Sequence, residues 1–284
     1  FIDVPLPGPR MPHDMAFTEN YVILNDFPLF WDADLMTKGV FAPRLHRDLP
    51  SRFAVIPRRG RTEDIRWFEA APTYALHFVN AYEDGETIVM DGFFQGQPEP
   101  SAEGITDKWL RAFRHLSLDL METRLHRWRF NLRTGESTEE RLSDSFTEFG
   151  MMNPLTTGRT YRYAYAATAI PGRFLFDGLV KHDVVAGTEE RVPFGDGVFG
   201  SETAMAPRVG STGEDDGYLI TFVTDMNQDA SFCHVYSAQA PAEGPVCVLR
   251  LPERISSGTH STWVAGAELR RWRTADDAAS AVGL

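Results

Sequence analysis

Cysteine is nearly absent from this sequence, because its 284 residues contain only Cys233 and Cys247. Two cysteines exclude a disulfide-rich scaffold and a zinc site built from four cysteines. The two could pair with each other, but the low count suits a reducing cytoplasm equally well. No stretch reaches the roughly 18 consecutive apolar residues of a membrane-spanning helix. We therefore expect a cytoplasmic protein.

Positive charge is also scarce. Lysine and arginine number 28 against 40 aspartates and glutamates, which gives a formal net charge of −12. Binding to a nucleic-acid backbone needs clustered lysine and arginine, so this balance predicts no nucleic-acid partner.

Short β-rich segments dominate the chain, and 43% of its residues are hydrophobic, as in a globular protein. Turn signals built on glycine, proline, aspartate or asparagine separate the segments, which predicts a single all-β domain over residues 1–284, either a sandwich, a barrel or a propeller. The predicted strands cover residues 21–24, 53–56, 74–80, 87–91, 125–130, 161–166, 174–180, 218–224, 232–236 and 246–251. Apolar residues at helical spacing near residues 106–122 predict a helical insertion.

Three of the eight histidines occur in unusual local settings. His13 precedes a predicted strand, His77 lies within an apolar segment where its ring needs a partner, and His260 lies close to the C-terminus. Converging imidazoles suit metals such as iron, although spacings of 64 and 183 residues form no local metal motif. We assign surface or structural roles to the other five, which are His46, His115, His126, His182 and His234.

Five motifs in order make the sequence similar to the carotenoid cleavage oxygenase family. Residues 11–21 (MPHDMAFTENY) resemble the family's H-D-x-x-x-T-x-x-Y signature, and residues 77–83 (HFVNAYE) resemble its H-x-x-N-A-Y-E strand. Residues 200–208 (GSETAMAPR), residues 214–218 (EDDGY) and residues 258–263 (GTHSTW) resemble its later blocks. The resemblance spans almost all of residues 8–264.

The resemblance implies a seven-bladed β-propeller with a non-haem Fe(II) on its axis, held by four histidines. Three of these histidines correspond to His13, His77 and His260. Glu148 and Glu202 match family glutamates that accept a hydrogen bond from the outer nitrogen of a ligand histidine, Glu148 from His77 and Glu202 from His260. A charge-assisted bond of this kind is about 2.7–2.9 Å long.

The family's first histidine ligand and its opening blades lie upstream of the signature found in residues 11–21. We therefore expect the chain to be the C-terminal part of a longer domain and to form an incomplete propeller. A preceding region should supply the fourth histidine.

Several local features call for a simpler interpretation or depart from the family pattern. Gly150 follows Glu148 and Phe149 at a position where the family often has proline, which bears on the shape of the pocket.

Residues 195–200 fit G-x-G-x-x-G, but no βαβ unit surrounds them, so dinucleotide binding is not expected. Residues 214–216 (EDD) are interpreted as a solvated loop rather than a cation site, and residues 125–130 as a half-buried strand.

The function implied by the resemblance is an Fe(II)-dependent dioxygenase. It would use O2 to cleave a conjugated C=C bond of a carotenoid or apocarotenoid into two carbonyl products. A stilbene-cleaving enzyme of the lignostilbene type is the alternative, and a non-catalytic propeller used for binding is a further one. A hydrophobic polyene or stilbene substrate also allows a peripheral membrane contact for its uptake.

Overall fold

The computed structural model of the chain describes residues 1–31, 33–37, 43–96, 122–171, 173, 175–256 and 258–271. Antiparallel strands supply almost all of the regular structure, which confirms the all-β prediction. The helix predicted near residues 106–122 lies outside the described residues except for Glu122, so it stays a prediction.

The first sheet begins within the signature that contains His13. It comprises β1 (Ala16–Phe17), β2 (Tyr21–Asp26), β5 (Ser51–Pro57) and β6 (Arg66–Ala70), hydrogen-bonded in that order. A small hairpin extends from it, with β3 (Leu29–Trp31) and β4 (Pro43–Leu45) on either side of the short helix α1 (Ala33–Thr37). The 3₁₀ turn η1 (Thr62–Asp64) connects β5 to β6.

The second sheet is also a four-stranded meander. It comprises β7 (Phe78–Asp84), β8 (Thr87–Gln95), β9 (Thr123–Asn131) and β10 (Ser137–Arg141). The predicted strand over residues 74–80 is too early, since β7 begins only at Phe78. The preceding segment is held by side chains instead, because the Thr73 hydroxyl accepts from the Gln95 N–H at 3.0 Å and the Tyr74 hydroxyl donates to the Met11 carbonyl at 3.0 Å.

The third sheet contains two further meanders. The first comprises β11 (Thr147–Met152), β12 (Tyr163–Ala169), β13 (Phe176–Asp183) and β14 (Thr188–Pro193), with η4 (Pro154–Thr156) after β11. The second comprises β15 (Val198–Pro207), β16 (Gly217–Asp225), β17 (Ala230–Ser237) and β18 (Pro245–Arg250), with η5 (Pro241–Glu243) before β18. One pairing, Phe176 with Gly200, joins the two meanders into an eight-stranded sheet.

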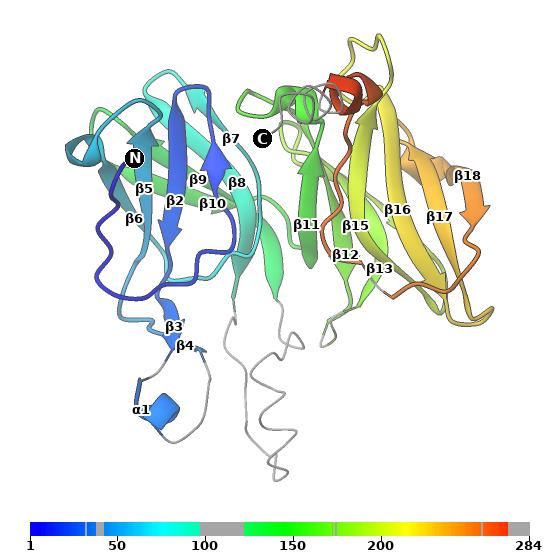
Figure 1. Cartoon of the computed structure of the whole chain (residues 1–284), viewed down its shortest axis with the longest axis horizontal. Coiled ribbons are helices and arrows are strands. Elements are labelled where there is room, and N and C mark those ends of the chain that lie inside the picture. The colour runs from blue at the N-terminus through cyan, green and yellow to red at the C-terminus, as the bar shows by residue number, and fades with distance from the viewer. Residues whose placement is uncertain are drawn as a thin grey trace, which may run out of the picture.

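Apolar cores fill the spaces between neighbouring sheets. Phe53 and Phe68 of the first sheet pack with Trp128 and Phe130 of the second in one cluster. A second cluster joins residues of β8 and β9 to residues of β12 and β13. Figure 1 accordingly shows the second sheet between the first, in blue, and the third, in green to orange. Within the described residues no sheet closes on itself, so the propeller ring stays a prediction.

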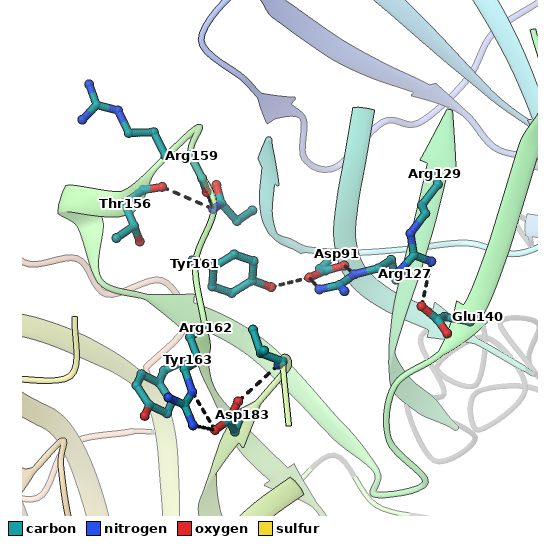
Figure 2. Close-up of polar contacts among 12 residues, drawn as sticks. Asp91, Arg127, Arg129, Glu140, Thr156, Arg159, Tyr161, Arg162, Tyr163 and Asp183 are labelled. Atoms are coloured by element: carbon teal, nitrogen blue, oxygen red, sulfur yellow. Dashed lines mark hydrogen bonds and ion pairs between the residues drawn. The ribbon is translucent and has the colours of Figure 1, made fainter. Parts of the chain in front are cut away.

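A buried ion pair within the second sheet also binds Tyr161, which lies just before β12 of the third sheet (Figure 2). Asp91 accepts two hydrogen bonds from the Arg127 guanidinium, both 2.7 Å, and a third of 2.5 Å from the Tyr161 hydroxyl. Burial and the Asp91 charge raise the pKa of Tyr161 well above its usual value, which keeps the hydroxyl a donor. The prediction that residues 125–130 form a half-buried strand is therefore wrong at Arg127, which points into the protein because its carboxylate partner is there.

Across the described residues, no helix is both long and apolar enough to cross a membrane.

Candidate metal centre

The first strands of the four meanders bring the candidate site together. β1 contacts β7, β7 contacts β11, and β11 contacts β15. His13 lies three residues before β1, His77 lies directly before β7, Glu148 is in β11 and Glu202 is in β15. His260 reaches the same place on the chain that leaves β18, because the Ser261 N–H donates to a Glu202 side-chain oxygen at 2.7 Å.

Three histidines form the centre of this arrangement. Each of His13, His77 and His260 offers one ring nitrogen, and these nitrogens lie within 4.8 Å of one another. Nitrogens bound to one ion at about 2.1 Å are separated by roughly 3–4 Å, so the cluster is close to a shared coordination sphere. Among the described residues, this is the only group of three or more histidine, cysteine or acidic side chains that could hold an ion.

The contacts of His77 suit a metal ligand. Its Nδ1 lies 2.6 Å from Oε2 of Glu148, whose side chain is fully buried. Its Nε2 is also buried and has no hydrogen-bond partner among the described residues. A carboxylate at Nδ1 holds the proton there and leaves the lone pair of Nε2 available to an ion. Burial acts to lower the pKa of His77, but the hydrogen bond and charge of Glu148 outweigh it and raise that pKa.

Glu202 holds the backbone near His260 rather than its imidazole. The Nδ1 of His260 lies 3.5 Å from Oε2 of Glu202, longer than the expected 2.7–2.9 Å. That oxygen accepts the Ser261 N–H instead, and the Ser261 hydroxyl donates to the main-chain carbonyl of Glu202 at 3.3 Å. His260 itself has a left-handed φ of 65°, which the loop must hold against steric cost.

His13 differs from the other two histidines in its surroundings. Its side chain makes no hydrogen bond within the described part of the chain, and it is exposed. Partial desolvation of its ring by the surrounding protein first, and then the charges of His77 and His260, lower the pKa of His13. A lowered pKa keeps the imidazole neutral, which is the form that binds a metal.

An aromatic wall covers one side of the cluster. The buried ring of Phe149 lies 5.1 Å from the His77 ring and 5.1 Å from the Phe176 ring, between centroids. The next residue is Gly150, where the family often has proline. A Cβ at Gly150 would lie 2.5 Å from Val79 Cγ2 and 2.6 Å from the Phe93 ring. Close packing by neighbouring side chains therefore requires glycine there.

Sequence reasoning missed two side chains of the H-x-x-N-A-Y-E motif that join separate sheets. Glu83 accepts hydrogen bonds from the Thr18 hydroxyl at 2.6 Å and from the Asn20 N–H at 2.8 Å, which ties β7 to the first sheet. Asn80 makes its contacts with the loop after β11, where its partners are Thr156, Gly158 and Arg159. The motif spacing was the available signal, but their partners are 63–79 residues away in the sequence.

Residues 214–216 form a partly exposed loop before β16, as expected, but their carboxylates are bound by protein groups. Glu214 accepts the main-chain N–H groups of Arg162 and Tyr163 at 2.8 Å. Asp215 pairs with Lys181 at 2.8 Å, and Asp216 pairs with Arg208 at 2.7 Å. These acids have protein partners because the loop lies against β12 and β13.

The remaining sequence features have structural explanations within the described residues. Residues 195–197 lie between β14 and β15, and residues 198–200 begin β15, so a strand and not a helix follows these glycines. His126 pairs with Glu139 at 3.0 Å, and His182 is buried. His46 stacks on Phe30 and His234 contacts the Tyr236 hydroxyl, whereas His115 lies outside the described residues. Both cysteines are free.

Comparison with known proteins gives a consistent result. The family model described as "Retinal pigment epithelial membrane protein" matches residues 2–265. Carotenoid 9,10(9',10')-cleavage dioxygenase 1 of Pisum sativum is 34% identical over 95% of this chain and 51% of its own length. Isoeugenol monooxygenase of Pseudomonas putida is 28% identical over 88% of this chain and 54% of its own length. The chain thus spans about half the length of the curated relatives that it matches.

Solved structures share the fold. A lignostilbene dioxygenase of Pseudomonas brassicacearum superposes with a TM-score of 0.80 at 27% identity, over 93% of this chain and 57% of the other. A variant of Synechocystis apocarotenoid oxygenase gives a TM-score of 0.80 at 24% identity, over 91% of this chain and 54% of the other.

Proposed function

Since this chain belongs to the retinal pigment epithelial membrane protein family, which includes the carotenoid cleavage dioxygenases, we propose that it forms part of a non-haem Fe(II) dioxygenase. The enzyme cleaves a conjugated C=C bond with O2 and yields two carbonyl products. The observation that carries the proposal is His77, whose buried Nε2 has no partner among the described residues and belongs to a cluster with two other imidazoles.

His13, His77 and His260 are the proposed ligands, and Glu148 and Glu202 support them. Neutral imidazoles suit iron and leave its positive charge uncompensated. A ferrous ion bound there would supply the chemistry of O2 activation. The fourth histidine that the family resemblance implies is not among the described histidines near this cluster, and we expect it from elsewhere in the intact protein.

The chain's own residues orient the ligands and exclude water. Glu148 accepts the Nδ1–H of His77, which keeps the proton on the side away from the cluster. Glu202 holds the Ser261 amide, which sets the path of the backbone at His260. Phe149 covers the Glu148–His77 pair with an apolar ring, so that pair is kept from solvent.

The four meanders are proposed to be four blades of a seven-bladed propeller. The repeated four-stranded antiparallel unit supports this, as does the likeness to the solved oxygenases. In a propeller the innermost strands surround the axis, which is the part of each meander that carries the candidate site residues here.

Carotenoids or apocarotenoids are the proposed substrates, because the plant relatives are named for carotenoid cleavage. A stilbene-type substrate is the second candidate, favoured by the 27% identity to a lignostilbene dioxygenase. Both are hydrophobic, so a peripheral membrane contact for substrate uptake is part of the proposal. A non-catalytic binding role is less well supported, since the candidate ligands and both glutamates are all present.

The test measures metal binding and turnover on the intact protein. Anaerobic titration with Fe(II) should give one site, and His77→Ala should abolish it. His126→Ala is the matched control, because His126 also pairs with a glutamate but lies outside the cluster. Carotenoid, apocarotenoid and stilbene panels are then incubated with the iron-loaded protein and O2, and the products are separated by HPLC. If the parent protein bound no iron, or if His77→Ala and His126→Ala lost iron binding equally, the proposal would be contradicted.

A further inference from the structure

Asp14 follows His13 directly, and its side chain reaches the segment that carries His77. Its Oδ2 accepts the N–H of Phe78 at 2.9 Å, and its Oδ1 accepts the N–H of Met15 at 2.7 Å. Phe78 is the residue after His77. A single carboxylate therefore joins the residue next to one proposed ligand to the residue next to another, across 64 positions of sequence.

The backbone of Asp14 is anchored as well. Its carbonyl oxygen accepts a hydrogen bond of 2.7 Å from the side-chain amide of Asn25, a buried residue of β2. The segment around Asp14 is thus fixed to the first sheet through its carbonyl and to the second sheet through its carboxylate.

His13 depends on such an anchor more than the other two histidines do. His77 is oriented by Glu148, and the backbone at His260 is held through Glu202. The imidazole of His13 makes no hydrogen bond within the described residues, so in this part of the chain the backbone on which it is carried is what anchors it relative to His77. The two rings lie 5.0 Å apart, between centroids.

We propose that Asp14 is a positioning residue of the metal centre, whose carboxylate sets the spacing between His13 and His77. The inference rests on the proposed function, because it assumes that these imidazoles bind one ion. Loss of the carboxylate leaves the Phe78 N–H without its acceptor and lets the two ligand-bearing segments move apart. Outer partners of metal ligands typically contribute about 10–100-fold to metal affinity.

Glu83 provides a matched control. Its carboxylate also joins the first sheet to β7, through Thr18 and Asn20. It does so at the far end of β7, six residues after His77. If Asp14 only stabilised the contact between the two segments, removal of either carboxylate would have the same effect on the metal centre.

The experiment compares Asp14→Asn, Asp14→Ala and Glu83→Gln in the intact protein. Co(II) and Fe(II) affinities are measured anaerobically, together with the visible ligand-field spectrum of the Co(II) form and the hydrogen exchange of the Phe78 amide without metal. Asp14→Ala should lower both affinities about 10–100-fold, change the Co(II) spectrum and speed the exchange. Asp14→Asn keeps one acceptor oxygen for two N–H groups, so its loss of metal affinity should be smaller than that of Asp14→Ala.

Glu83→Gln should lower the melting temperature yet leave the Co(II) spectrum and both affinities at parental values. Parental affinity and spectrum in both Asp14 variants would overturn the inference while leaving the proposed function intact. An equal loss of affinity in Glu83→Gln would also overturn it. If the parent protein itself bound neither ion, the proposed function would fail and the inference with it. Should Asp14→Ala not fold, Asp14→Asn gives the same readouts.

Discussion

Replacing Glu148 with glutamine tests the contact between this buried carboxylate and His77. The Nδ1 of His77 lies 2.6 Å from Oε2 of Glu148. The same oxygen also accepts the N–H of Phe149, and Oε1 is buried with no partner among the described residues. A glutamine must therefore place its oxygen at the Oε2 position, where two donors meet, and its NH2 group at the Oε1 position.

Two effects follow from that orientation. A hydrogen bond to a charged group contributes about 1.5–3 kcal/mol and a neutral one about 1 kcal/mol, so the bond to His77 weakens by about 0.5–2 kcal/mol. That difference is about 2–30-fold in metal affinity. The buried NH2 group at the Oε1 position lacks an acceptor within the described residues, and this should lower the free energy of unfolding by about 1–3 kcal/mol.

The assay combines anaerobic chelator competition for Fe(II) with urea unfolding of the metal-free protein. Glu139→Gln is the control, because Glu139 pairs with His126 at 3.0 Å and is partly exposed. It should change metal affinity by less than about twofold, since surface-accessible pairs contribute little. Unchanged affinity in Glu148→Gln, or the same loss in Glu139→Gln, would refute the reasoning.

Three further predictions concern other parts of the molecule. Glu202→Gln should reduce iron affinity less than Glu148→Gln does, because Glu202 contacts the amide after His260 rather than its ring; a larger loss by chelator competition would contradict this. Asp91→Asn should lower the free energy of unfolding in urea by about 3–5 kcal/mol, because it leaves a buried guanidinium without its counter-charge, and a loss below about 1 kcal/mol would argue against that role. Burial lowers the pKa of His182 from 6.5 to about 4, so between these values the unfolded chain binds a proton that the folded protein does not. The free energy of unfolding therefore keeps its full value above pH 6.5, and protonation of His182 in the unfolded chain lowers it by up to about 3 kcal/mol as the pH falls to 4. His182→Gln should flatten that slope relative to the parent in urea unfolding, and an identical pH dependence would refute it.

Local sequence was sufficient for the all-β character and for about half of the strands. β2, β5, β8, β9, β12, β13, β16, β17 and β18 all overlap predicted segments. The period of apolar residues and the turn residues between segments depend only on near neighbours, which the sequence displays directly. The prediction was less accurate at β7, where the bonds of Thr73 and Tyr74 to distant residues delay the strand to Phe78.

Charged side chains were the harder class, because their environment is set by partners far along the chain. Arg127 belongs to a segment expected to be half-buried, yet its charged side chain is itself buried against Asp91, 36 residues away. The acids of residues 214–216 were expected in solvent, yet Glu214 binds main-chain amides 51 and 52 residues away. A charged side chain is buried only where a partner compensates its lost hydration, and sequence spacing does not reveal that partner.

The candidate ligands could be named from the sequence because the order of the motifs resembles a known family. Their convergence depends on the tertiary structure. His13, His77 and His260 are separated by 64 and 183 residues, and Glu148 is 71 residues from the histidine that it contacts. Only the packing of β1, β7, β11 and β15 against one another brings these side chains to one place. The sequence by itself therefore determined which imidazoles and carboxylates are available, while the packed sheets decided their distances, because side-chain distances across strands depend on register and sheet packing rather than on local propensity.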